Sequence, residues 1–142
     1  MSNTTKTSMK LTYEGARIAV AAAAAKADEI GVPQCIAVVD DGGRLMAFAR
    51  MDGAKFLSVM TSQTKAQTAA SNRAPTSKIK PEDELKLALA AQSQLTNLKG
   101  GLPIIVNGTC IGAIGVGSGT GDQDIEVAKA ALVALGADPV DI

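Results

Sequence analysis

An Asn-Gly pair at positions 107 and 108 constrains the fold of this chain more than any other feature. It separates two apolar runs, residues 102–106 and 109–116, and Asn-Gly is the preferred pair for the type I′ turn of a β-hairpin. Residues 35–39 and 44–51 flank a second turn sequence, Asp-Asp-Gly-Gly, and predict a second hairpin. Two hairpins imply a mostly antiparallel sheet, which excludes a doubly wound nucleotide-binding fold.

Four other segments carry apolar residues at helical spacing: 12–31, 56–72, 81–98 and 122–135. Thr12 is an N-cap residue for the first helix, and Gly31 ends it. The third helix begins at Pro81 with three carboxylates in its first turn, and Gly100 and Gly101 cap it. Its predicted inner face consists of Leu85, Ala88, Leu89, Gln92, Leu95 and Leu98. The expected order is helix, hairpin, helix, helix, hairpin, helix, with helices that can cover both faces of the sheet.

The length and composition predict one domain with a tightly packed core. Two independent cores are hard to sustain in 142 residues, and apolar residues make up 46% of the chain. There are two Phe, one Tyr and no Trp. Small alanine side chains fill a core only if the helices lie close to the sheet. Burial of surface against another copy would add to the stability of such a chain, so we expect self-association.

The charge of the chain argues against a nucleic-acid partner. Lys plus Arg and Asp plus Glu number 14 each, and a neutral chain without aromatic platforms lacks the phosphate neutralisation that supplies most of that affinity. Residues 53–81 hold five basic and no acidic side chains, whereas residues 120–142 hold five acidic ones against Lys129. These regions are two solvated faces or the halves of a subunit interface, or else the basic one borders a pocket for an anionic small molecule.

The cysteines and the first residues bear on the cellular location. Cys35 and Cys110 lie in apolar strand segments, so we expect free buried thiols rather than a disulfide scaffold or a zinc site. The first ten residues lack the apolar centre of a secretion signal, and no run of 18 apolar residues predicts a membrane span. We expect a cytoplasmic protein without membrane contact, with residues 1–10 as a disordered leader and residues 11–142 as a single domain.

Residues 117–121, Gly-Ser-Gly-Thr-Gly, precede the last helix and invite comparison with phosphate-binding loops. They match neither the G-x-G-x-x-G dinucleotide pattern nor a P-loop, which needs a lysine after its glycines. The helix also begins with Asp122, Asp124 and Glu126, whose charges would repel a phosphate. The loop is either a turn that needs positive φ angles, or the wall of a ligand pocket formed by its amides and Ser118.

One face of the predicted helix 56–72 carries small polar side chains around a single lysine. Its members are Ser58, Thr61, Ser62, Lys65, Thr68 and Asn72. This face either packs closely against the sheet or another helix, or forms the polar side of a small cavity. In the second case Lys65 would anchor an anion or donate a proton.

The chain has no histidine. This excludes Ser-His-Asp triads, Cys-His dyads, histidine-based metal sites and histidine-ligated haem. Acid–base chemistry would have to use Asp, Glu, Lys, Cys or Tyr13.

Five short segments stand in a specific order along the chain: residues 36–40 (IAVVD) with Gly42-Gly43, 47–54 (AFARMDGA), 65–69 (KAQTA), 101–105 (GLPII), and 112–119 (GAIGVGSG) with Gln123-Asp124. In this order and spacing they resemble the GlcG/HbpS-like family, which includes the C-terminal domain of PduO proteins. The resemblance runs from about Leu11 to Gly136. It implies a profilin-like α+β fold, a three-layer α/β/α arrangement with a five-stranded antiparallel sheet, assembled into tetramers or octamers.

The resemblance also makes haem a cofactor to test. Several relatives bind haem, and some are described as haem-degrading or as redox sensors. Haem binding in such proteins commonly involves histidine, and the position after Gly42-Gly43, often histidine in relatives, is Arg44 here. Without histidine, iron would have to be ligated by Tyr13, Cys35, Cys110, a methionine or a lysine.

Three functions stay open at this point, and none of them uses a metal site. The first is a small-molecule-binding protein for haem or another small anion. Its ligand-binding residues would be Arg50, Asp52, Ser58, Lys65, Gly117, Ser118 and Gly119. The second is a cofactor-free isomerase or lyase that moves a proton on a small carboxylate or phenol, with Arg50 or Lys65 holding the anion and Asp124 or Asp52 as the base. The third is an accessory structural subunit.

Overall fold

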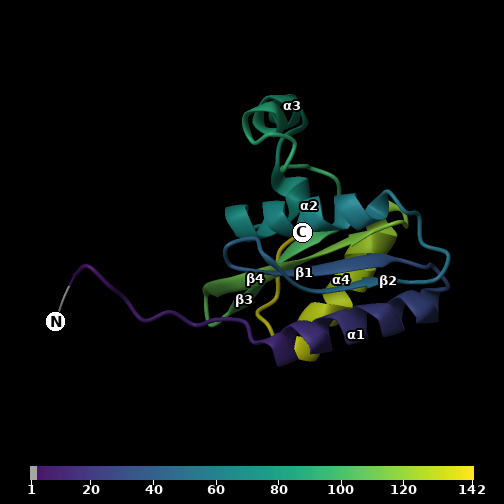
Figure 1. The fold of residues 1–142 in the computed structure, drawn as a ribbon, viewed down its shortest axis with the longest axis horizontal. Helices are drawn as coiled ribbons and strands as arrows, with labels where there is room; N and C mark the ends of the chain where they lie inside the picture. Colours follow the sequence, from purple (N-terminus) through teal and green to yellow (C-terminus); the bar gives the residue numbers. More distant parts are fainter. Residues whose placement is uncertain (1–2) are drawn as a thin grey trace.

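The computed structural model describes residues 3–142 and places one antiparallel sheet between two helical layers (Figure 1). The elements are α1 (Tyr13–Ile30), β1 (Cys35–Asp40), β2 (Leu45–Arg50), α2 (Ser58–Asn72), the 3-10 helix Thr76–Lys78, α3 (Pro81–Ala90), β3 (Gly101–Val106), β4 (Thr109–Gly117) and α4 (Gly121–Leu135). α2 covers one face of the sheet, and α1 and α4 pack together on the other. The predicted α+β class and element order are confirmed.

Both predicted hairpins form, and β1 pairs with β4 to give the strand order β2-β1-β4-β3. Asn107 and Gly108 have φ angles of 50° and 78°, as a type I′ turn requires. The expectation of five strands is wrong, because the sheet of the described residues has four. The long connection between α2 and β3 forms helices and turns instead of a further edge strand.

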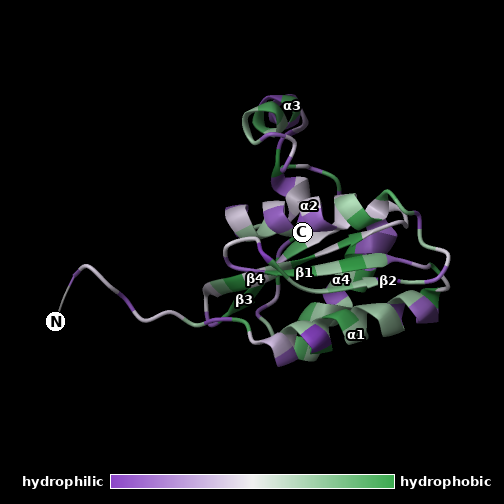
Figure 2. Cartoon of the chain, in the orientation of Figure 1, coloured by the Kyte–Doolittle hydropathy of each residue, from purple (hydrophilic) through white to green (hydrophobic). Residues whose placement is uncertain are grey.

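Small residues allow the helices to lie close to the sheet. α1 turns Ala16, Ala19 and Ala23 inward, and all three are fully buried. On the other face, a Cβ on Gly115 would lie 1.9 Å from the Ser62 carbonyl oxygen, so α2 can approach β4 this closely only at glycine. Apolar residues accordingly concentrate in the strands and along α1 (Figure 2).

α3 differs most from expectation. It ends at Ala90 rather than near residue 98, because Gln92 and Ser93 adopt left-handed φ angles of 55° and 66° that a right-handed helix cannot include. The helix stands away from the sheet, beyond α2 (Figure 1), and none of its residues is buried. The predicted inner face is therefore wrong: Leu85 and Leu89 are 70% and 71% exposed, since α2 already covers that side of the sheet.

The segment before α1 extends away from the body toward the N-terminus (Figure 1), and residues 3–10 are exposed. Residues 5–12 form neither helix nor strand, and Lys10 Nζ lies 2.8 Å from Asp41 Oδ2. Residues 1 and 2 of the expected leader lie outside the described residues.

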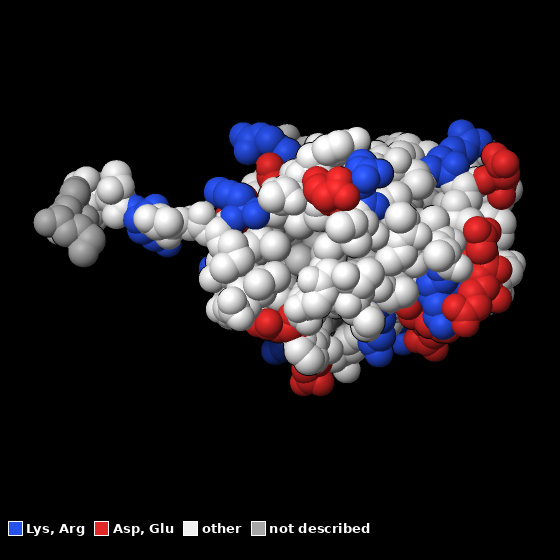
Figure 3. Space-filling view, turned by 90° about the horizontal axis from the view of Figure 1, so that it is seen from below, with Lys and Arg blue, Asp and Glu red and all other residues white. Residues whose placement is uncertain are grey.

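Seen from below, charged side chains lie mainly around the margin of the molecule, and the centre of this face is uncharged (Figure 3). Among residues 3–142, no helix has the length and apolar character needed to cross a bilayer.

Candidate functional site

Lys65 and Asp124, the two candidate catalytic residues, form a buried ion pair. α2 brings Lys65 against the end of β4, and the first turn of α4 brings Asp124 to it, so that Nζ lies 3.0 Å from Oδ2. Lys65 Nζ also donates to the Val116 carbonyl oxygen at 2.8 Å. The two side chains are 6% and 3% exposed, so both groups are held away from water.

Asp124 also holds the turn that follows β4. Its Oδ1 accepts the Gly119 amide N–H at 3.0 Å, and Gln34 Oε1 accepts the same N–H at 3.1 Å. Burial raises the pKa of the Asp124 carboxyl, although Lys65 and these hydrogen bonds act in the opposite direction. Lys65, Asp124 and Gly119 are thus brought together in the interior with Gln34, whose buried Nε2 has no hydrogen-bond partner among the described residues.

Arg50 and Asp52 lie at the same end of the sheet as this network and line a separate hollow. The strand register places Arg50 and Gly117 on either side of Cys35, in three neighbouring strands. Arg50 and Asp52 border a cavity of about 520 Å³ next to the end of α1. The described lining of this cavity includes neither Lys65 nor the loop 117–119.

The loop after β4 is supported by the start of α2. Ser118 has a φ of 100°, and its Oγ accepts the Lys55 amide N–H at 2.9 Å. Ser58 is buried beside Gly117, where a Cβ would lie 3.4 Å from Ser58 Oγ. Ser58, Gly117 and Ser118 are therefore neighbours, and the hydroxyl of Ser118 already accepts a backbone hydrogen bond.

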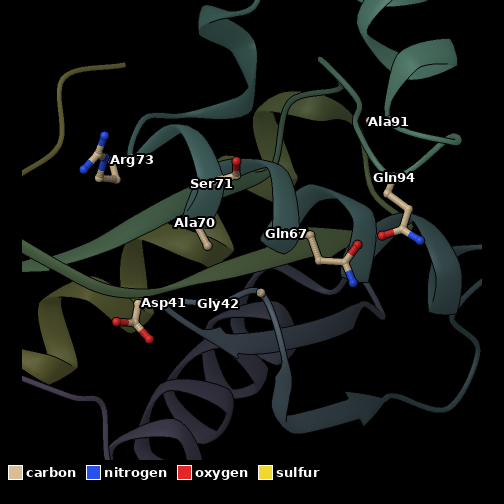
Figure 4. Close-up of a pocket in the computed structure, with 9 residues that line it drawn as sticks. Asp41, Gly42, Gln67, Ala70, Ser71, Arg73, Ala91 and Gln94 are labelled. Atoms are coloured by element: carbon tan, nitrogen blue, oxygen red, sulfur yellow. The ribbon is translucent and has the colours of Figure 1, made fainter.

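Sequence reasoning missed a larger hollow at the opposite end of β1. This cavity of about 590 Å³ lies between the β1–β2 turn, the second half of α2 and the segment after α3. Its lining residues are Asp41, Gly42, Gly43, Gln67, Ala70, Ser71, Arg73, Ala91 and Gln94. In the view of Figure 4, Arg73 and Asp41 lie on one side of the cavity, and the side-chain amides of Gln67 and Gln94 lie on the other.

Arg73 is the unusual residue of this cavity. It follows the last residue of α2 in a left-handed conformation with φ 54°, and its backbone N–H donates to the Ala69 carbonyl oxygen. A non-glycine residue held there carries strain of ~1–3 kcal/mol, which is more frequent at functional sites. Within residues 3–142, the Arg73 guanidinium forms no hydrogen bond or ion pair. Only the basic excess of residues 53–81 could have drawn attention to it from the sequence.

A second cavity of about 570 Å³ shares Arg73 and Asp41 with the first and adds Lys6, Met9 and Cys110 to the lining. Asp41 is the one carboxylate in the two described linings. Its hydrogen bond to Lys10 lowers the pKa of the carboxyl, and the pair is charge-neutral. Arg73 and Lys6 therefore give the joined cavities a net positive charge.

The side chains in these linings that could donate to haem iron are Lys6, Met9 and Cys110. Cys110 is half-buried rather than buried as expected, and its Sγ lies 3.3 Å from the Gly112 carbonyl oxygen. Burial raises the pKa of the Cys110 thiol, which makes it a less ready ligand for iron than an ordinary cysteine. Tyr13 is exposed on α1, and Cys35 is buried between strands. In the part of the chain that the structure describes, no three His, Cys, Asp or Glu side chains gather around a metal position.

Comparison with known proteins identifies the family. The family model described as "Haem degrading protein HbpS-like" matches residues 11–133. Protein GlcG of Escherichia coli K12 is 40% identical over 115 residues, which cover 78% of this chain and 84% of GlcG. The ORFY protein of Klebsiella pneumoniae has 35% identity and a TM-score of 0.89 over 98% of this chain and 99% of its own. A PduOC–haem complex, at 23% identity, shares the fold with a TM-score of 0.86, covering 94% of this chain and 100% of its own. The chain belongs to the HbpS-like family.

Proposed function

We propose that this HbpS-like chain binds a small anionic molecule at the two cavities that meet at Arg73. The observation that carries the proposal is the guanidinium of Arg73, which borders both cavities and has no carboxylate partner within residues 3–142. Because Asp41 is paired with Lys10, no free carboxylate opposes an incoming anion. Arginine presents a planar set of donors that matches a carboxylate or phosphate.

The size and polarity of the cavities support a polar ligand. Their volumes, about 590 and 570 Å³, lie within the ~300–1,000 Å³ of small-molecule sites. The amides of Gln67 and Gln94 and the hydroxyl of Ser71 can donate or accept hydrogen bonds. A small carboxylate with further hydroxyl or carbonyl groups fits this lining better than an apolar molecule does.

Haem is the second ligand to test, because the PduOC neighbour is a haem complex. Arg73 and Lys6 would suit its two carboxylates. The iron would need a donor, and apart from lysine the lining offers only the Cys110 thiol, whose pKa is raised by burial, and the thioether of Met9. We therefore expect a small carboxylate to bind and haem not to bind stoichiometrically.

The two other functions considered from the sequence, an enzyme and an accessory structural subunit, require other features of the protein. An enzyme that used Asp124 as its base would need substrate access to a carboxylate that is 3% exposed and paired with Lys65. This burial favours binding over proton transfer at that position. For the protein as a whole we propose a cytoplasmic homo-oligomer, and an accessory structural role would require the assembly without the ligand.

A thermal-shift screen of small carboxylates tests the proposal, because a ligand of the folded state raises its apparent stability. Arg73→Ala should abolish the shift produced by the best compound, and Arg50→Ala is the matched control that should retain it. If Arg50→Ala abolished the shift and Arg73→Ala retained it, the ligand would instead bind at the end of the sheet where Arg50, Lys65 and Ser118 lie. A second experiment titrates haemin into the same proteins. A stoichiometric Soret shift would overturn the choice of a small carboxylate as the ligand.

A further inference from the structure

We propose that α3 is a docking arm for a second copy of this chain, and that its leucine face packs on the exposed apolar start of α2 in that copy. The docking arm is α3 with Leu85 and Leu89. The receiving surface, here called the α2 patch, consists of Phe56, Leu57 and Met60. This contact assigns a surface to the expected self-association and does not depend on the identity of the ligand.

The docking arm has an apolar face without cover in its own chain. α3 stands away from the body beyond α2 (Figure 1), and none of its residues is buried. Leu85 and Leu89 are four residues apart, so they lie on the same side of the helix, and each is about 70% exposed. A helix of ten residues is too short to be stable in water by itself. Packing against another surface would supply the missing stabilisation.

The α2 patch is a second uncovered apolar surface. Phe56, Leu57 and Met60 are each at least 63% exposed. Phe56 and Leu57 also line an apolar cavity of about 370 Å³ at the start of α2. A hollow of this size and character accepts leucine side chains, so the two uncovered surfaces match in chemistry.

The arm is not placed to cover the patch of its own chain. The segment that follows α3 borders the first ligand cavity together with Gln67 and Ser71, in the second half of α2. Leu57 precedes Gln67 by ten residues, which is ~15 Å along a helix. The patch therefore lies well away from the place where the arm leaves the body, and a second copy is needed to bring the surfaces together.

Charge and area point to the same partner. The first turn of α3 carries Glu82 and Asp83, while residues 53–80 hold no acidic side chain and Lys55 lines the patch cavity. At ~150–250 Å² for an aromatic side chain and somewhat less for leucine and methionine, the five partly exposed apolar side chains offer at most roughly 650 Å² per copy. A two-fold pair that exchanges both arms would bury up to roughly 1,300 Å², near the lower end of the ~1,200–2,000 Å² of specific interfaces.

Light scattering of size-separated protein tests the contact on both of its sides. Leu85→Gln with Leu89→Gln changes the arm, and Phe56→Gln with Met60→Gln changes the patch. Glutamine keeps a good helix propensity, so circular dichroism should show unchanged helix content. Each double variant should lose at least half of the molar mass of the wild-type assembly. Val133→Gln, at an 80% exposed position on α4, is the matched control and should not change the mass.

Disulfide trapping then identifies the partners within the contact. In a Cys110→Ser background, a mixture of Leu89→Cys and Met60→Cys chains should give a cross-linked mixed dimer, whereas neither chain alone should. Cross-linking of Leu89→Cys by itself would show arm-to-arm packing and overturn the proposed contact. A monomeric wild type, or unchanged mass in the arm variants, would overturn docking of a second copy through this face. Both experiments measure the mass of the assembly, so their outcomes do not depend on anion binding at Arg73.

Discussion

Replacing Asp124 by asparagine tests how strongly the centre of this fold depends on one buried charge. Asparagine has nearly the same shape and keeps an oxygen that can accept the Gly119 amide N–H, as Asp124 Oδ1 does at 3.0 Å. Lys65 would lose the carboxylate that lies 3.0 Å from its Nζ and would retain the Val116 carbonyl oxygen. The substitution therefore removes the charge and places the amide Nδ2, a hydrogen-bond donor, against the Lys65 ammonium, which is also a donor.

The expected loss of stability follows from the burial of Lys65 and Asp124. With side-chain exposures of 6% and 3%, neither charge is screened by water, and leaving one of them unpaired costs ~3–5 kcal/mol. Lys65→Met should cost less, ~2 kcal/mol, because the Asp124 carboxyl can then take up a proton instead of staying charged. The double variant Lys65→Met with Asp124→Leu leaves no buried charge. We expect it to be more stable than Asp124→Asn and to give a coupling energy of at least ~2 kcal/mol.

Urea unfolding of the wild type, both single variants and the double variant at pH 7 measures these free energies. The pH dependence of the stability of Lys65→Met gives a second test. Burial already raises the pKa of the Asp124 carboxyl, and removal of Lys65 raises it further. The protonated form is then favoured in the folded state, so Lys65→Met should be least destabilised below the unfolded pKa of ~3.9 and should lose stability as the pH rises through the folded pKa. A cost below 1 kcal/mol for Asp124→Asn, or a coupling energy near zero, would refute the reasoning.

Three further substitutions or modifications probe the other features. Arg73→Gly should raise the free energy of unfolding by ~1 kcal/mol, because glycine relieves the left-handed φ, yet abolish the ligand-induced thermal shift; a variant that is less stable would contradict the strain argument. Gly115→Ala should cost at least ~3 kcal/mol in urea unfolding, since its Cβ would lie 1.9 Å from a carbonyl oxygen of α2; a near-neutral effect would mean that α2 can shift outward. Cys110 should react with a thiol reagent faster than buried Cys35, with both slow at pH 7 and faster above the ordinary thiol pKa, because burial raises both pKa values. Equal rates would show that the strands open.

The parts of the fold that the sequence predicts well are those encoded by neighbouring residues. The Thr12 hydroxyl accepts the Gly15 amide N–H at 2.9 Å, and Gly31 ends α1 with a left-handed φ of 71°. The hairpin at Asn107 and Gly108 likewise follows from two adjacent residues. Each of these signals acts over one turn of chain and does not depend on the rest of the molecule.

The parts that could not be predicted depend on which surfaces meet. The spacing of Leu85 and Leu89 indicates an apolar helix face, but it does not say which surface that face covers, and in this chain it covers none. The small polar side chains around Lys65 indicated a polar contact. The partner of Lys65, however, lies 59 residues further along the chain. The two groups meet only because α2 covers β4 and the first turn of α4 follows the end of that strand. The strain at Arg73 has no sequence signal, because arginine is an ordinary residue at the end of a helix.

Stability and the proposed ligand binding are therefore assigned to different parts of α2, its middle and its C-terminal end. Lys65 and Asp124 satisfy each other in the interior, so neither charge is free for a ligand. Arg73, eight residues and ~12 Å further along the helix, is strained and unpaired within the described residues, and its charge faces two cavities. Relief of strain at the C-terminal end of α2 should then change ligand binding, and loss of the charge pair at its middle should change stability. Arg73→Gly should remove binding without loss of stability, and the Lys65→Met, Asp124→Leu double variant should bind the same anion with unchanged affinity. A single variant that lowered both affinity and stability would show that the middle and the C-terminal end of α2 act as one site.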